Sequence, residues 1–189
     1  MKYLLGIGIG MGMAMACVQP ASAQSVFGIS EGTSIGSVTV VRSYSNNNYS
    51  ITVPVPNPEF ESYMVTAPST TGICRITGLG ISYANESQVR AAFGRLRTAL
   101  DGKYGTSRQY DYNNAKSGNW AKDIRADKAS LSAFWPSGDL NKAPALSSNI
   151  QSIGLEVRAL DDGSLYLAVR YEFRNYARCA GDGADNRGL

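Results

Sequence analysis

Few residues of this chain have side chains suited to catalysis, because the sequence contains no histidine. Histidine is the usual general base for serine and cysteine nucleophiles and the commonest metal ligand. Catalytic triads, histidine-zinc sites and histidine-ligated haem are therefore excluded. The sequence also lacks a G-x-x-x-x-G-K-[ST] phosphate loop, and its glycines near residue 30 lack the strand-turn-helix context of a dinucleotide fingerprint. We expect no cofactor.

Carboxylate chemistry is the catalytic option that remains. Glu59 and Glu61 alternate along a predicted strand, about 7 Å apart at the backbone, which is near the separations that glycosidases use. This pair allows an alternative function, a carboxylate-dependent hydrolase of an envelope glycan. Such acids are also typical of gatekeeping charges at the start of an edge strand. No metal site is expected, because Asp182 and Asp185 lack the ligand spacing and closing Glu of a calcium loop.

A polar stretch between residues 104 and 128 is the better candidate for binding. It carries Arg108, Tyr110, Tyr112 and Trp120 among further basic residues. Tyr, Trp and Arg most often carry interface energy, and a long loop held by a rigid sheet is a usual place for them. We predict partner binding through these four residues. The alternative is that the tyrosines line one face of another strand while Trp120 anchors a short helix in the core.

The N-terminus predicts where such binding takes place. Lys2, an apolar run over 3–18 and Ala21-Ser22-Ala23 have the order of a cleavable signal peptide, residues 1–23. The run is shorter than the roughly 20 apolar residues of a spanning helix and is rich in glycine, so no stable membrane span is expected after cleavage. The predicted location is periplasmic or secreted. Lipidation at Cys17 is a minority option, because the usual lipobox leucine is missing.

Export gives the cysteines a predicted role. After cleavage only Cys74 and Cys179 remain, an even number in an oxidising compartment. We predict a Cys74–Cys179 disulfide, which on the chain-entropy model would stabilise the fold by roughly 4 to 5 kcal/mol. Two separate buried thiols are the alternative. Neither cysteine has a C-x-x-C neighbour.

Charge and composition limit the class of partner. The chain has 18 Lys and Arg against 15 Asp and Glu, and the two signs are interspersed. Nucleic acids and anionic membranes attract clustered basic residues, so neither is an expected partner. With 43% apolar residues the chain is expected to fold. Its length predicts a single domain over 24–180 and a flexible tail over 181–189.

Hydrophobic patterning predicts strands over 38–41, 49–55, 61–67, 73–81, 131–135, 153–160 and 164–173. Pro54 removes a ladder donor, which favours a sheet edge for the second strand. The one predicted long helix covers 85–104, with apolar residues at three- and four-residue steps, Asn85 as its cap and Gly105 at its end. The opposite face carries Arg90, Arg95, Arg97 and Asp101, a pattern typical of a solvated surface.

The last two strands predict their own turn. The apolar residues of the two strands must share one sheet face. They are Leu155, Val157 and Ala159 in the first strand and Leu165, Leu167 and Val169 in the second. Residues that pair across the two strands must therefore both have odd numbers or both have even numbers. A three-residue loop, 161–163, with Gly163 in the left-handed region satisfies this. Hairpins with one long helix predict an α+β fold, an antiparallel β-sheet with the helix packed on one face and one disulfide.

Several segments resemble a family of small exported bacterial proteins of unknown function. They are Phe27-Gly28, Phe60-Glu61-Ser62-Tyr63, Gly72-Ile73-Cys74, 96–105, Ala133-Phe134-Trp135 and 171–179. The resemblance spans most of the chain after the signal and contains both cysteines, but it implies no activity. Residues 32–38 are similar to the entry of small envelope lipoproteins and β-lactamase-inhibitor-like domains.

The sequence therefore predicts an exported protein that acts by binding a protein of the cell envelope or another exported protein. Inhibitor, immunity and envelope-assembly proteins are functions of this kind.

Overall fold

We describe residues 24–115, 117–138, 146–147 and 149–181 of a computed structural model. The predicted signal peptide, Cys17 and residues 182–189 lie outside the described residues. The elements are a 3-10 helix η1, eight strands and three α-helices. In chain order they are η1 (Ile35–Ser37), β1 (Thr39–Ser43), β2 (Asn48–Thr52), β3 (Phe60–Thr66), β4 (Arg75–Gly80), α1 (Glu86–Tyr104), β5 (Arg108–Asn113), α2 (Trp120–Arg125), β6 (Ala129–Trp135), β7 (Ile150–Ala159), β8 (Leu165–Phe173) and α3 (Tyr176–Gly181).

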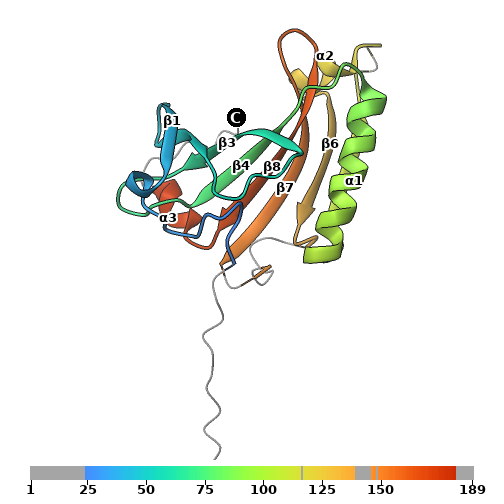
Figure 1. Cartoon of the computed structure of the whole chain (residues 1–189). Coiled ribbons are helices and arrows are strands. Elements are labelled where there is room, and N and C mark those ends of the chain that lie inside the picture. The colour runs from blue at the N-terminus through green and yellow to red at the C-terminus, as the bar shows by residue number, and fades with distance from the viewer. Residues whose placement is uncertain (1–23, 116, 139–145, 148, 182–189) are drawn as a thin grey trace, which may run out of the picture.

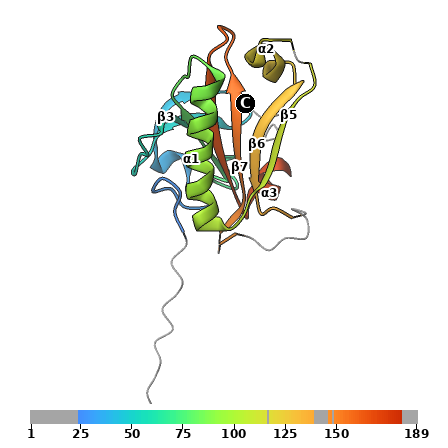
Figure 2. The same ribbon diagram turned by 90° about the vertical axis from the view of Figure 1, so that its right-hand side faces the viewer.

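The strands form one antiparallel sheet in the order β1-β2-β3-β4-β8-β7-β6-β5. The α+β class and the antiparallel sheet are as predicted from the sequence. The long helix α1 contacts β7 and β8 (Figures 1 and 2), but two short helices accompany it. Strand β5 was foreseen only as an alternative interpretation of the tyrosines.

Alternation of side chains divides β5–β8 between two environments. Odd-numbered residues face α1: Trp135 hydrogen-bonds Asp101 of α1, and the Tyr171 ring lies 6.5 Å from that of Tyr104. Their buried apolar members form the core with α1, namely Leu131, Ala133, Ile153, Leu155, Val157, Leu165, Leu167 and Val169. Even-numbered residues of these strands, with the odd-numbered residues of β4, lie on the other side, which we call the open face. Ile150 is an exception, because the register shifts between Ile150 and Ser152 and Ile150 pairs with the buried Phe173.

Helix α1 begins where the sequence predicts. The Asn85 side chain accepts a hydrogen bond from the Gln88 backbone N–H, and Gly105 ends the helix at a φ of 84°. Its own residues Val89, Phe93 and Leu100 are buried on the face that packs against the sheet. Its C-terminal end is fixed to β6, because the buried Trp135 indole N–H donates to Asp101 Oδ1 at 3.0 Å and to the Gly105 carbonyl at 2.8 Å.

The charged face of α1 is partly solvated, but two of its arginines also make contacts that the sequence did not predict. Arg90 makes a bidentate hydrogen-bonded ion pair with Asp111 on β5, at 2.8 and 3.1 Å. Arg97 donates to the side chains of Ser107 and Gln109. These arginines reach beyond the helix and attach it to β5. Charge spacing alone does not reveal this, because the partners are set by tertiary packing.

The β7–β8 hairpin confirms the turn deduced from parity. Ala159 pairs with Leu165 and Leu155 with Val169, so the predicted apolar residues share a face. Leu160 N–H donates to the Ser164 carbonyl at 2.8 Å, which leaves a three-residue loop. Gly163 has a φ of 87°.

The second predicted strand was too long and was wrongly placed at an edge. Strand β2 ends at Thr52, and it lies between β1 and β3. Pro54 follows the strand and therefore costs it no ladder hydrogen bond. Val55, which lies beyond the end of the strand, is 61% exposed.

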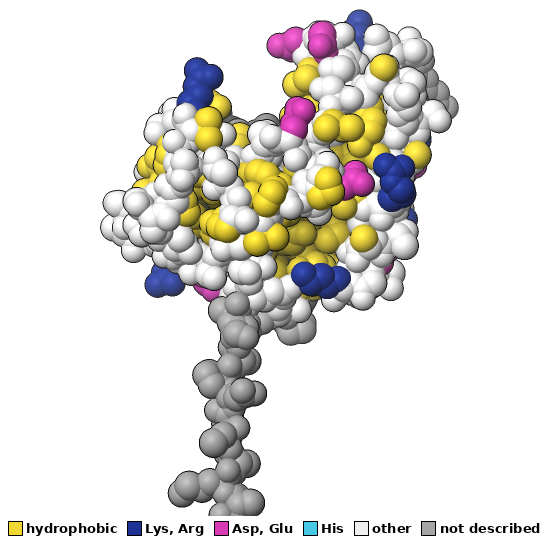
Figure 3. All heavy atoms as spheres, viewed as in Figure 1, with side chains coloured by type: hydrophobic (Ala, Val, Ile, Leu, Met, Phe, Trp, Pro, Cys, Tyr) yellow, Lys and Arg dark blue, Asp and Glu magenta, His cyan; other side chains and the backbone are white. Residues whose placement is uncertain are grey.

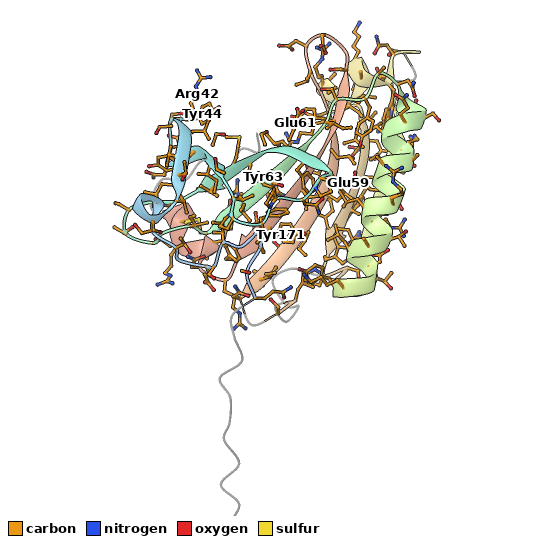
Figure 4. All side chains as sticks on the ribbon, in the orientation of Figure 1. Arg42, Tyr44, Glu59, Glu61, Tyr63 and Tyr171 are labelled. Carbon is orange, nitrogen blue, oxygen red and sulfur yellow. A yellow bond between two sulfur atoms is a disulfide. The ribbon has the colours of Figure 1, made fainter. Side chains whose placement is uncertain are left out.

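An aromatic cluster joins the N-terminal segment to the sheet. The Phe27 ring lies 4.9 Å from Tyr63, 5.6 Å from Phe60 and 5.8 Å from Tyr171. Figure 4 labels Tyr63 and Tyr171, and Figure 3 shows hydrophobic side chains gathered in this region between β3 and α1. Gly28 has a φ of 81°, and a Cβ there would lie 2.9 Å from Pro54.

The predicted disulfide is present. Cys74 and Cys179 are bonded, 105 residues apart in sequence, and both are fully buried. The bond joins the residue before β4 to α3. It is compatible with a location outside the reducing cytoplasm.

Candidate functional site

Three of the four predicted binding residues form a row on the open face. Arg108, Tyr110 and Tyr112 alternate along β5, so their side chains share one side of the strand. The tyrosines are 38% and 42% exposed. The Arg108 guanidinium lies 5.0 Å from the centre of the Tyr110 ring, which packs edge-on against Phe134 of β6 at 5.9 Å. We call these three residues the β5 row.

Trp120 lies apart from this row. It begins α2, is only 8% exposed and belongs to the hydrophobic core. The Arg90 guanidinium of α1 covers its ring at 4.6 Å, which places it on the α1 side of the sheet. Among the described residues its indole N–H has no hydrogen-bond partner. The structure thus places Trp120 where the alternative interpretation expected it, in a short helix against the core.

A hollow adjoins the β5 row on the open face. Its cavity volume is about 480 Å³, within the range of ligand pockets. Its floor is formed by side chains of four neighbouring strands, β5 to β8, and its outer end by α2 and the turn that follows. The lining residues are Tyr112, Ile124, Arg125, Asp127, Ala129, Ser130, Ser132, Phe134, Glu156, Val157, Arg158, Ala159 and Tyr166. We call this the β6–β7 hollow.

Charged side chains continue from the hollow across the open face in a chain of ion pairs. Glu156 accepts from Arg158 at 2.8 Å and lies 3.6 Å from Arg170. Glu172 lies 3.5 Å from Arg170 and 3.7 Å from Arg75, and accepts from the Ser152 hydroxyl at 2.7 Å. We call this the ion-pair ladder.

Sequence reasoning did not select the ladder residues. The sequence does contain a pattern that marks them as polar-face residues. Charged and apolar residues alternate in β7 and β8, and the charged ones are Glu156, Arg158, Arg170 and Glu172. Alternation identifies a polar face but not the cross-strand register that pairs these charges, nor the neighbouring strand that contributes Arg75.

Tyr166 borders both the hollow and the ladder. Partial burial raises the pKa of its phenol; the positive charge of Arg158 opposes this rise and the negative charge of Glu156 adds to it. The hydroxyl therefore stays protonated at neutral pH and can both donate and accept a hydrogen bond in the hollow.

The carboxylate pair does not have the geometry expected from the sequence. Strand β3 begins at Phe60, after Glu59, and its register shifts between Phe60 and Ser62, so Glu61 is the extra residue of a bulge. The regular alternation of the two acids is therefore lost. Neither lines the β6–β7 hollow. Figure 4 shows both at the start of β3.

Two kinds of feature are absent from the described residues. No group of three or more Cys, Asp or Glu side chains is placed to hold a metal ion there. In the same part of the chain, no helix is long and apolar enough to cross a membrane.

The open face therefore combines an aromatic-basic row, a hollow and paired charges, an arrangement suited to contact with another molecule. Comparison with protein-family models, curated protein sequences and solved structures finds no match to this chain.

Proposed function

We propose that this protein binds a polypeptide partner, an envelope or exported protein, through the open face of its sheet. Binding occurs by surface complementarity, with the β5 row and the β6–β7 hollow as the contact region. This function is of the inhibitor, immunity or assembly type, and export of the chain is part of the proposal.

One observation carries the proposal: Tyr112 belongs to both the β5 row and the hollow. Aromatic side chains next to a recess are typical of interface hot spots, because a partner group that enters the recess excludes water from the ring. Tyr110 and Arg108 extend the same surface along β5. Ordered strands hold all three, so little conformational entropy is lost on binding.

The lining of the hollow indicates what enters it. Arg125 and Arg158 are balanced by Asp127 and Glu156, and Phe134, Tyr112 and Tyr166 add aromatic surface. A polyanion would meet as many carboxylates as guanidiniums here. A polypeptide loop with mixed apolar and polar groups fits this lining better, and its backbone can hydrogen-bond Ser130, Ser132 and Tyr166.

The test is affinity capture from envelope extract, followed by measurement of the dissociation constant with each captured protein. Tyr112→Ala removes the shared side chain. We expect it to weaken binding at least tenfold, about 1.4 kcal/mol. Tyr44→Ala is the matched control, because Tyr44 is 45% exposed and lies under Arg42 as Tyr110 lies under Arg108, at the opposite end of the sheet (Figure 4).

A partner that binds the Tyr112→Ala protein as tightly as the wild type would refute the proposed site. If no protein is enriched over a bead control, the proposed function itself fails. Circular dichroism of each variant shows that the fold is kept.

A further inference from the structure

Strand β5 is a regular sheet edge. It ends the strand order and pairs with β6 over its whole length, from Arg108 opposite Phe134 to Asn113 opposite Ala129, without a bulge. Asn114 N–H donates to the Lys128 carbonyl at 2.8 Å and continues this register. Because bonded pairs alternate, Tyr112, Tyr110 and Arg108 bond β6, and the backbone groups of Gln109 and Asp111 point outward.

The outward backbone groups are available in the described part of the chain. Neither Gln109 nor Asp111 makes a backbone hydrogen bond there outside the ladder with β6. Their side chains are held from the α1 side, Gln109 by Arg97 and Asp111 by Arg90. The edge is thus preformed, and an added strand would not have to order it.

The opposite edge is blunted. In β1, Val40 pairs with Ile51 and Arg42 with Ser50, so Val41 is an extra residue that interrupts the ladder. Bulges of this kind hinder edge-to-edge pairing. Strand β5 has no such interruption.

We propose that two copies of this chain pair antiparallel through β5, about a twofold axis perpendicular to the sheet. The two sheets then join into one, and both open faces lie on the same side. Tyr110 lies at the axis, opposite Tyr110 of the second copy. This inference does not depend on the proposed function.

Complementarity of β5 with itself selects this register. Arg108 comes opposite Tyr112 of the second copy, a cation–π pair like the one Arg108 already makes with Tyr110. Gln109 comes opposite Asp111, whose charge Arg90 compensates. A two-residue shift in one direction would put Asp111 opposite Asp111 of the second copy, and like charges directly opposite are destabilising. A two-residue shift in the other direction would leave only residues 108–110 of the two β5 strands paired with each other. A one-residue shift would mismatch the two faces.

The occupant is a second copy because five of the six residues of β5, from Arg108 to Tyr112, find their counterparts in the same segment of the second copy. Such an isologous contact satisfies Arg108 and Tyr112 twice in one interface. Pairing flanks the two exposed tyrosines of each chain at the sheet edge and leaves the open face of both copies accessible.

The test is sedimentation of the purified protein over a concentration series from the low micromolar range upward. We expect a monomer–dimer equilibrium for the wild type. Gln109→Pro removes one outward N–H but no bond to β6, and proline is tolerated on an edge strand. It should weaken dimerisation at least tenfold. Gln109→Ala, which loses the same side chain but keeps the N–H, is the control and should dimerise at least tenfold more strongly than Gln109→Pro.

A second pair of variants tests the register and does not rely on proline. Tyr110→Lys places two lysines opposite each other at the axis and should abolish the dimer, most strongly at low salt. Tyr44→Lys, at the other end of the sheet, should leave it unchanged. A wild type that stays monomeric overturns the proposal. So does a dimer that survives Tyr110→Lys in a folded protein, because a different surface must then hold it.

Discussion

The two faces of the sheet differ most clearly in β7, where neighbouring residues differ in solvent exposure. Leu155 is fully buried on the α1 side, whereas the side chain of Glu156, the next residue, is 21% exposed on the open face. The same alternation divides Val169 from Arg170 in β8. One face carries the apolar burial that drives folding, which leaves the composition of the other free to serve binding.

The energetics of the two faces should differ accordingly. Removal of a fully buried side chain loses its transfer free energy and leaves a cavity. The carboxylates and guanidiniums at Glu156, Arg158 and Arg170 stay partly hydrated, so each pair gains little net free energy over solvation by water. Substitutions on the open face should therefore alter binding with little effect on stability.

The largest expected effect tests this difference on adjacent residues. Leu155→Ala should lower the free energy of unfolding by about 2 to 5 kcal/mol, because it leaves a cavity under α1. Glu156→Gln, its matched control, should change it by less than about 1 kcal/mol. Urea denaturation with a common slope measures both. Equal losses would contradict the division of roles between the faces.

A somewhat smaller effect is expected from the disulfide, which lies at the end of the open face away from the hollow. There the centre of the Tyr176 ring of α3 lies 4.4 Å from the Arg75 guanidinium carbon. The double variant Cys74→Ala with Cys179→Ala should lower stability by about 2 to 4 kcal/mol, the usual contribution of a disulfide, which is smaller than the chain-entropy model gives for a loop of this length.

Hydrogen exchange would locate the effect of losing the disulfide. Protection of backbone amide hydrogens from exchange should fall first in α3 and at the start of β4. The amides of β6 and β7 around the hollow should keep their protection. Uniform loss over the whole sheet would show that the bond supports both ends equally.

Local signals in the sequence were enough to predict several elements. Asn85 starts α1 through a hydrogen bond to its side chain, and Gly105 ends the helix in a positive-φ conformation that glycine adopts because it has no side chain. The length of the β7–β8 turn could be predicted because side chains alternate strictly in a strand. Leu155 and Val169 must share one face, and only a loop with an odd number of residues allows this. The disulfide followed from the cysteine count and the expected compartment.

The missed features depend on contacts between distant segments. Strand β5 was ambiguous because Arg108 to Asn113 is polar, and its strand conformation is stabilised by pairing with β6 and by Arg90 and Arg97 of α1. The hollow could not be foreseen, since it needs the order of four strands. Of the four predicted binding residues, burial against α1 separates Trp120 from the other three.

The smallest effect concerns Asp101, a carboxylate on the α1 side. Burial opposes its ionisation, but hydrogen bonds from Ser107 and Trp135 and the charge of Arg97 outweigh burial and lower its pKa. A lowered pKa contributes stability that is fully present above about pH 4, the ordinary value for Asp, and is lost as the pH falls through the folded-state pKa.

Asp101→Asn should therefore cost roughly 1 kcal/mol above pH 4, since the amide is a weaker acceptor and does not attract Arg97. Below that pH the difference from the wild type should shrink, because Asp101 itself becomes protonated. Denaturation curves at several pH values measure this. Trp135→Phe, which removes one donor, should raise the pKa of Asp101 in a carboxyl NMR titration. A stability difference that is constant with pH would mean that Asp101 acts through packing alone, and the Arg90–Asp111 ion pair would then be the electrostatic contribution of the α1 side to compare with the ion-pair ladder.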